Sequence, residues 1–435
     1  MTGPDQDGHE RAFRVLRHHD FRLFWVAELV SVLGTQVQRV AIIWQVYQLT
    51  ESPFQLGLLG LFRFLPVLVF GLAGGVIADQ RDRRQTLLIT QVVLLLTSGV
   101  LVTTTTAGMI SMPIIYGVTF FSAMVSSVAQ PTRQALVPNL VPVTSLTGAM
   151  TMNILAYQVA AVSGPALGGL IIAWSGVGAA YLIDVISFGA VIIAVLLLKT
   201  HGDRQPLKIT GFAAAKEGLR FLRNSPVLLG LMSLDFLATF FGASTVLMPV
   251  FAADLLDVGA QGLGILLTAP AVGAVAGSLV MSVIRTPGRP GRGVLVAVAV
   301  YGACVAGFGL SQSLWAALLF LAGSGAADAV SMALRHTVRN LVTPDALRGR
   351  IAAAHSTFAM GGPQLGEFEA GLVAALAGAR VSVTAGGVAT MVVALFMFRL
   401  VPGLARTVVT VGSGGTVANR PTADGKVATD TSPSD

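Results

Sequence analysis

The chain contains twelve apolar segments, each long enough to cross a lipid bilayer. A membrane-spanning helix needs roughly 20 mostly apolar residues, because the hydrocarbon core is about 30 Å thick. The segments are residues 22–47, 54–78, 85–107, 112–134, 148–174, 178–198, 227–251, 260–284, 293–311, 314–336, 350–377 and 380–401. Backbone polar groups in hydrocarbon must be satisfied within the segment itself, which favours helices. We therefore expect an all-α polytopic membrane protein with twelve transmembrane helices.

The composition agrees with this class and excludes several functions. Only 11% of the 435 residues are charged, against about 25% in ordinary soluble domains. Cys304 is the one cysteine, so an intrachain disulfide is impossible, and no Cys/His cluster has metal-ligand spacing. No Walker A motif suggests ATP as an energy source. Since no nucleophile–base set is visible either, we expect neither an enzyme nor a cofactor.

The basic residues fall on one side of the predicted membrane. Of the 28 lysines and arginines, 25 lie before the first segment, in alternate loops or in the tail. Arg380 is the exception on the other side, and Arg39 and Arg63 lie within segments. The positive-inside rule then places both termini in the cytoplasm and the protein in the cytoplasmic membrane. The net charge of +7 is a topology signal, so we expect no nucleic-acid partner; the expected partners are the bilayer, a small-molecule substrate and protons, with the protein as a monomer.

An internal repeat divides the segments six and six. "NLVPVTSLTG" (139–148) is echoed by "NLVTPDALRG" (340–349), and "SGPALGG" (163–169) by "GGPQLGE" (361–367). We expect a cytoplasmic segment 1–21, a first half 22–198, a cytoplasmic linker 199–226 with a surface amphipathic helix, a second half 227–402 and a disordered tail 403–435. Two parallel six-helix halves are typical of secondary transporters, with substrate bound between them near the midplane.

The loop after the second segment reads "GGVIADQRDRR" (74–84) and resembles the signature loop of the major facilitator superfamily. Four residues match that signature, and Gln80 and Asp82 depart from it. The matching residues are Gly75, Asp79, Arg83 and Arg84. The resemblance implies a gating role, with Arg133 at the end of the fourth segment as the expected partner of Asp79. The alternative is that these charges only anchor the loop at the headgroups.

Two further resemblances refine the expectation. "GPALGG" provides Gly164, Pro165, Gly168 and Gly169, which resemble the core of the antiporter motif of the same superfamily; plain helix packing is the alternative. Over roughly residues 12–402, strings such as "YLIDVISFG" and "GGPQLGEFEAG" resemble the enterobactin exporter branch and its macrolide-efflux relatives. That resemblance implies export from the cytoplasm driven by proton uptake.

An acid within a predicted span is costly and is a functional hypothesis by default. Glu367 and Glu369 lie about 200° apart on a helix, so both cannot face one cavity. Glu367 shares a face with Gln364, and we expect it to bind a proton or substrate, or alternatively to be a structural acid with a partner. Arg39, in the polar string "TQVQR", could bind an anionic substrate or pair with an acid such as Glu367. We expect Glu369 to be structural.

Five further charged residues lie within the segments: Glu28, Arg63, Asp184, Asp235 and Asp328. Asp235 is a second candidate for proton coupling, and Asp328 is a candidate gate acid beside Arg335. Glu28 and Arg63 complete the candidate substrate and proton-coupling set, whereas we expect Asp184 to be structural.

The sequence thus favours a proton-coupled exporter of a siderophore-like or hydrophobic drug-like molecule that works by alternating access. A proton-coupled importer is the alternative within the same class. A membrane sensor or assembly partner without transport is the alternative outside it.

Overall fold

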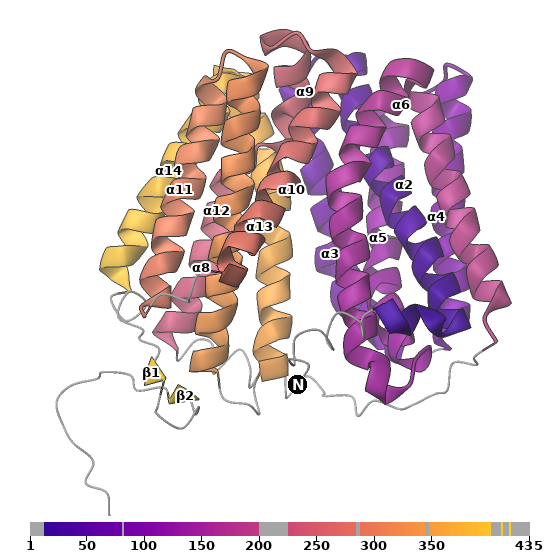
Figure 1. Cartoon of the computed structure of the whole chain (residues 1–435). Helices are drawn as coiled ribbons and strands as arrows, with labels where there is room; N and C mark the ends of the chain where they lie inside the picture. Colours follow the sequence, from indigo (N-terminus) through magenta and orange to yellow (C-terminus); the bar gives the residue numbers. More distant parts are fainter. Residues whose placement is uncertain are drawn as a thin grey trace, which may run out of the picture.

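The structure is a computed structural model that describes residues 13–80, 82–199, 225–283, 288–343, 348–401, 410–411 and 417–418, with residues 71–80, 348–350, 352–360, 410–411 and 417–418 described by their backbone alone. Long helices make up almost all of it (Figure 1). They are α2 (His19–Thr50), α3 (Pro53–Gln80), α4 (Arg83–Thr106), α5 (Met112–Leu136), α6 (Leu146–Leu197), α8 (Pro226–Phe241), α9 (Met248–Val250), α10 (Gly259–Val283), α11 (Pro290–Leu310), α12 (Leu314–Val342), α13 (Arg348–Ala377) and α14 (Ala379–Leu400). Shorter elements are the 3₁₀ turns η1 (Val15–Arg17), η2 (Val137–Asn139), η3 (Val143–Ser145) and η4 (Thr245–Leu247), the π-helix η5 (Phe251–Leu255), and the antiparallel strands β1 (Thr410–Val411) and β2 (Val417–Ala418).

These helices form the twelve predicted membrane crossings. Within the described residues, ten stretches are long and apolar enough to span a bilayer. One of them, Val143–Leu197, crosses twice, because α6 is broken at Gly176. Gly176 has φ +79°, a conformation that glycine adopts without a steric cost. Helix α13 supplies the remaining crossing, so the prediction of twelve transmembrane helices is confirmed.

Local sequence signals explain where several helices begin. The Asp82 side chain accepts hydrogen bonds from the backbone N–H groups of Arg84 and Gln85, and so caps the start of α4. Pro226 and Pro290 open α8 and α11, at positions where a missing N–H costs nothing. The seventh crossing is interrupted after Phe241, and a π-helical turn closes it at 251–255.

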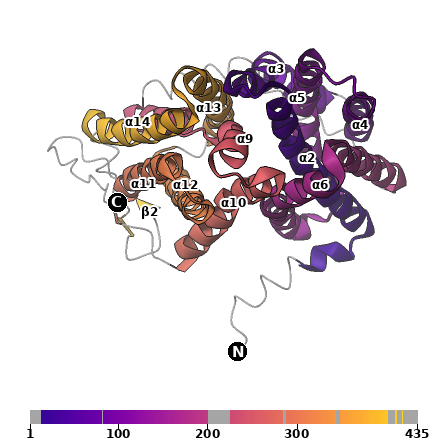
Figure 2. The ribbon, with the colours of Figure 1, turned by 90° about the horizontal axis from the view of Figure 1, so that it is seen from above.

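The helices form two bundles that lie side by side (Figure 1). Helices α2–α6 make the first half and α8–α14 the second. We call the side of the bundle at which Lys199 and Ser225 lie the linker side, and the side with the Gly176 turn the distal side. Seen along the bundle axis, α3 lies beside α13, α6 lies beside α10, and α9 sits near the centre (Figure 2).

The apolar core is shared at one side and divided at the other. On the distal side, one cluster of buried side chains runs through both halves, from Val40 and Leu59 to Phe251 and Leu266. On the linker side, the described residues form two separate clusters, one in each half. The hydrophobic effect therefore holds the halves together on the distal side, while each half keeps its own core on the linker side.

Three expected segments fall wholly or partly outside the described residues. The amphipathic linker helix lies among residues 200–224, and the basic start of the chain before residue 13. In the tail, where disorder is predicted, the four described residues form the two-residue ladder of β1 and β2, and the prediction for the rest of the tail stays untested.

Candidate transport site between the halves

The two halves meet at two glycine crossings on the distal side. At one, α3 crosses α13, and a Cβ added to Gly57 would lie 2.9 Å from the Gly371 Cα. At the other, α6 crosses α10, and a Cβ added to Gly169 would lie 2.8 Å from the Gly264 Cα. Side chains almost never approach so closely, so these glycines allow backbone-to-backbone contact.

The antiporter-type motif is divided between two neighbours. Gly164 and Gly168 pack against Gln36 and Val37 of α2, inside the first half. Gly169 packs against α10 of the second half. With Pro165 buried between them, the motif brings α6 close to both helices. These contacts support the interpretation that the motif serves helix packing, whereas its role in antiport stays a prediction.

An ion pair joins the halves beside the first glycine crossing. The Arg63 Nη1 of α3 lies 3.5 Å from the Glu367 Oε2 of α13. Both side chains are largely buried, at 18% and 15% exposure. A Cβ at Gly60 would fall 2.8 Å from the Glu367 Cβ, so this glycine makes room for the acid. One turn earlier on α13, the Gln364 Oε1 is buried without a hydrogen-bond partner among the described residues.

Arg39 is a second guanidinium near this pair. Its side chain is exposed although its neighbours Gln38 and Val40 are buried. No carboxylate of the described residues lies within 4 Å of it, so of the two alternatives for Arg39 the pair with Glu367 is not formed here: Arg63 takes that place. The positive charge of Arg39 repels the positive charge of Arg63. Two guanidinium groups and one carboxylate leave a net positive charge between the halves.

Each half also carries an internal ion pair at an equivalent place. In the first half, the Arg133 Nη1 donates to the Glu28 Oε1 at 2.7 Å. In the second half, Arg335 binds Asp235. Glu28 and Asp235 both lie nine residues after the start of their helices, α2 and α8, and the arginines lie near the ends of α5 and α12. The repeat seen in the sequence therefore reappears as a repeated contact between the first and fourth helix of each half.

The second pair has an extra acid. The Arg335 Nη2 donates to the Asp328 Oδ1 at 3.0 Å. Asp328 lies two turns before Arg335 on the same helix. Arg335 and Asp235 are buried, at 5% and 7% exposure, whereas the Asp328 side chain is 40% exposed. Arg335 therefore binds two acids, and the accessible one is Asp328.

The basic residues of the signature loop bind helix ends within the first half. Arg83 donates to the Ala135 carbonyl at 3.0 Å and Arg84 to the Leu196 carbonyl at 2.9 Å. A cation is favourable at a helix C-terminus, because the last carbonyls carry partial negative charge. Arg133 binds Glu28, and its expected contact with Asp79 stays untested, because Gly75 and Asp79 are described by their backbone alone. The gating role stays a prediction.

One hydrogen bond joins the two halves near the centre of the distal side. The Tyr47 hydroxyl, near the end of α2, donates to the Asp254 carboxylate in η5. Tyr47 is buried and Asp254 is exposed. Neither residue stood out in the sequence, because a tyrosine and an acid at helix ends near the membrane surface are ordinary there.

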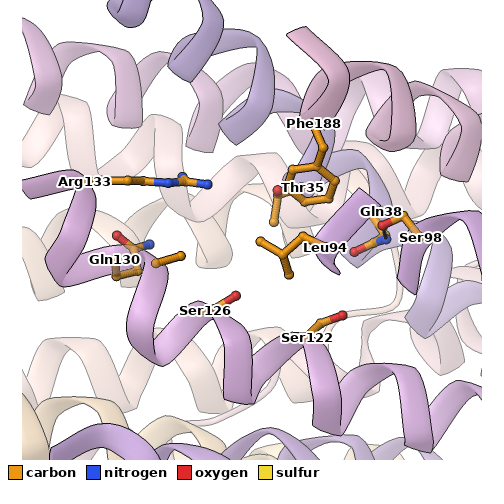
Figure 3. A pocket seen from close by; sticks show the side chains of 10 residues that line it. Thr35, Gln38, Leu94, Ser98, Ser122, Ser126, Gln130, Arg133 and Phe188 are labelled. Atoms are coloured by element: carbon orange, nitrogen blue, oxygen red, sulfur yellow. Dashed lines mark hydrogen bonds between the residues drawn. The ribbon is translucent and has the colours of Figure 1, made fainter. Parts of the chain in front are cut away.

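The sequence also gave no signal for a small polar cavity inside the first half (Figure 3). Its lining combines hydroxyl, amide and guanidinium groups from α2, α4, α5 and α6: Thr35, Gln38, Leu94, Ser98, Ser122, Ser126, Ala129, Gln130, Arg133 and Phe188. Arg133 was predicted as a gate residue, and the structure places it at one end of this cavity (Figure 3). Polar residues spread over four helices converge only in three dimensions, so a linear pattern does not reveal them.

Comparison with known proteins identifies the family. The family described as transmembrane secretion effector, within the major facilitator superfamily, matches residues 10–408. The chain belongs to this family. As a major facilitator transporter it is not an enzyme, and no group of three or more His, Cys, Asp or Glu in the described residues could hold a metal ion.

Curated relatives and solved structures agree with the family. The enterobactin exporter EntS of Citrobacter koseri is 25% identical over 389 residues, covering 89% of this chain and 93% of the relative, and that of Shigella boydii is equally similar. A bacterial homologue of the human lysosomal transporter Spinster, solved inward-facing and unoccupied, superposes with a TM-score of 0.69 at 16% identity, over 88% of this chain and 96% of that one. The human organic anion transporter MFSD10 gives a TM-score of 0.59 at 16% identity, over 87% and 98%.

Proposed function

We propose that this transporter is a proton-coupled exporter that works by alternating access. The observation that carries the proposal is the ion pair between Arg63 and Glu367, which connects the two halves inside the membrane. Alternating access moves one half against the other around a central site. An ion pair across that boundary makes the charge of Glu367 depend on the relative position of the halves.

The coupling follows from the electrostatics of one carboxylate in two environments. When the distal side is closed, Arg63 lies beside Glu367 and favours its ionised form. When the distal side opens, Arg63 moves away, and a carboxylate in a poorly hydrated site then favours a bound proton. Each closure therefore expels a proton toward the linker side. Proton binding and distal opening are linked, because a ligand shifts an equilibrium by its differential affinity for the two states.

For the substrate, we propose an acidic siderophore-like or a hydrophobic drug-like molecule. The unpaired Arg39 next to Arg63 supports the acidic class, because guanidinium groups bind carboxylate and related anions through parallel hydrogen bonds. The relatives named enterobactin exporter support the siderophore class. Phe236, Phe240 and Phe368 lie near the boundary on α8 and α13 and provide apolar contact for an aromatic substrate.

The proposed orientation puts the linker side and both termini in the cytoplasm. It rests on the basic residues that gather there, and the described ones include Arg17, Arg83, Arg84, Lys199, Arg289 and Arg399. Substrate then enters from the cytoplasm and leaves on the distal side, across the cytoplasmic membrane.

The test is substrate-dependent proton flux in proteoliposomes that contain a pH dye and have an acidified lumen. Siderophores and hydrophobic antibiotics are added outside, and we expect at least one of them to drive proton efflux and to accumulate inside. In Glu367→Gln the flux falls at least tenfold. Glu369→Gln is the matched control, two residues along the same helix, and keeps wild-type flux. Equal proton flux in wild type and Glu367→Gln would remove Glu367 from the coupling path. Substrate that moves in the same direction as the protons would identify an importer.

A further inference from the structure

The polar cavity of the first half is too small for the transported molecule. Its volume is about 90 Å³, whereas pockets for drug-sized ligands measure ~300–1,000 Å³. It lies within one half, among α2, α4, α5 and α6, and not between the halves. A cavity of roughly 10–15 Å³ on this measure already holds one water molecule, so this cavity has room for several, and water fills buried cavities that offer several polar partners.

The cavity has a polar wall along its whole length. Ser122, Ser126 and Gln130 follow one another at intervals of four residues, so they share one face of α5 and point into the cavity (Figure 3). Arg133 lies at one end, toward the linker side, and Gln38 and Ser98 lie at the other (Figure 3). Filled with water, this cavity would form a hydrated passage that leads from Arg133 into the middle of the first half.

A buried carboxylate lies directly behind the inner end of this passage. Asp184 on α6 has 0% exposure. Its Oδ2 accepts a hydrogen bond from the Ser98 hydroxyl at 2.7 Å, and its Oδ1 accepts one from the Thr35 hydroxyl at 3.5 Å. The Gln38 amide donates to the same Ser98 oxygen at 2.6 Å. One layer of hydroxyl groups, which also lines the cavity, therefore separates Asp184 from the cavity interior.

No counter-ion accompanies this carboxylate. Within the described residues, no lysine, arginine or histidine nitrogen lies within 4 Å of it. Asp184 is the one charged residue of α6, and α5 has only Arg133, which is bound to Glu28. The charged residues of α4 are Arg83 and Arg84 at its linker-side end, and the other ionisable side chains of α2 are His19, Asp20, Arg22, Arg39 and Tyr47.

An ionised carboxylate without a counter-ion is costly to bury, so a proton is the natural ligand of this site. We propose that Asp184 is a second proton-binding residue of the transporter, which exchanges its proton with the linker side through the hydrated cavity. The inference rests on the proposed proton-coupled transport and extends it: Glu367 binds a proton at the boundary of the halves, and Asp184 binds one inside the first half.

The hydrogen-bond chemistry allows the exchange without rearranging the helices. A hydronium ion in the cavity gives a proton to the Ser98 oxygen while Ser98 passes its own hydroxyl proton to the Asp184 carboxylate, and a water molecule is left in the cavity. The resulting acid donates to the Ser98 oxygen, which has two lone pairs and can accept from Asp184 and Gln38 together. The new Ser98 hydroxyl hydrogen points toward the cavity. At the other end, the Glu28 Oε2 and the Arg133 Nε are buried without a hydrogen-bond partner in the described part of the chain, and a water in the cavity would satisfy them.

The test is infrared difference spectroscopy of the full-length transporter in lipid nanodiscs, without substrate, between alkaline and acidic pH. We expect a protonated carboxyl band that grows on acidification and is lost in Asp184→Asn. In Ser98→Ala the frequency of the band shifts, because the acid loses its hydrogen-bond partner. Thr90→Val on the same helix is the matched control and leaves the band in place, since the Thr90 hydroxyl bonds only to the Leu87 carbonyl of its own helix.

A band that is unchanged in both Asp184→Asn and Ser98→Ala would overturn the inference, even if proton-coupled transport is demonstrated in liposomes. A band that depends on Asp184 and Ser98 supports the proton site, even in a protein that moves no protons with any tested substrate. If Asp184→Asn does not yield folded protein, the Ser98→Ala shift decides alone. The two proposals therefore fail independently.

Discussion

Breaking the ion pair between Arg63 and Glu367 should shift the transporter toward a state with an open distal side. At 3.5 Å and an effective dielectric constant of about 20, the bare attraction is ~5 kcal/mol. Desolvation offsets part of it, and close charge pairs at interfaces show coupling energies of ~1.5–7 kcal/mol. The Glu367 Oε2 lacks a proper hydrogen bond, so we expect the low end, about 2 kcal/mol. Since each 1.4 kcal/mol is tenfold, Glu367→Gln should raise the open-to-closed ratio about 30-fold.

The ratio can be measured from distances between spin labels on the distal side. Met109 in the first half and Trp315 in the second are 71% and 80% exposed, so both accept a label after replacement by cysteine. Cys304 is the one native cysteine, and Cys304→Ser gives a suitable background. Double electron–electron resonance then reports the short and long populations. Acidification of the wild type should increase the long distance, and Glu367→Gln should no longer respond.

A double-mutant cycle makes the reasoning refutable. Arg63→Gln alone should also favour the open state, because it leaves Glu367 without its partner. The double variant Arg63→Gln/Glu367→Gln should open no further than a single variant, since one shared contact can be lost only once. Additive shifts, or no shift in either single variant, would show that the pair does not hold the halves together.

Three other perturbations should act at named contacts. In Gly264→Val, the new side chain collides with α6 at the glycine crossing, so the distal side cannot close and substrate flux falls to background in liposomes. Glu28→Gln leaves Arg133 buried without a counter-ion and should lower the free energy of unfolding by about 3 kcal/mol, which thermal denaturation in detergent detects; an unchanged melting temperature would contradict the pairing. Tyr47→Phe removes the bond to Asp254 and should raise the open-to-closed ratio about fivefold, for a hydrogen bond worth ~1 kcal/mol, in the same spin-label assay.

The fold was predictable because a bilayer allows very few kinds of backbone structure to cross it. Twelve apolar stretches could form only helices, and their boundaries follow from caps and breaks that the sequence contains, such as Asp82 and Pro226. The break at Gly176 separated two predicted crossings, although the helix on both sides is assigned as one element. Periodicity and length depend on local sequence alone, which is why this part needed no tertiary information.

The site was predictable in its residue types but not in its pairs. Glu367, Arg63, Asp235 and Asp328 stood out because charges in hydrocarbon are rare. Which arginine meets which acid depends on the crossing of helices far apart in the chain, and here Glu367 meets Arg63 and not Arg39. Asp184 received a structural role because its hydroxyl neighbours and the adjacent cavity come from other helices.

The internal repeat relates the α6–α10 crossing to the α3–α13 crossing. The two crossings differ at the position of the proposed proton-binding acid. Pro165 and Pro363 occupy equivalent positions, and the same offset makes Gly169 equivalent to Glu367. At the α6–α10 crossing, Gly169 allows two backbones to touch, with no charge present. At the α3–α13 crossing, Glu367 faces Arg63 instead. One crossing therefore brings two neutral backbones together, whereas the other depends on an ion pair. In the proposed mechanism the halves pivot at the first crossing and are locked by the second, so that protonation of Glu367 is coupled to the motion of an entire half.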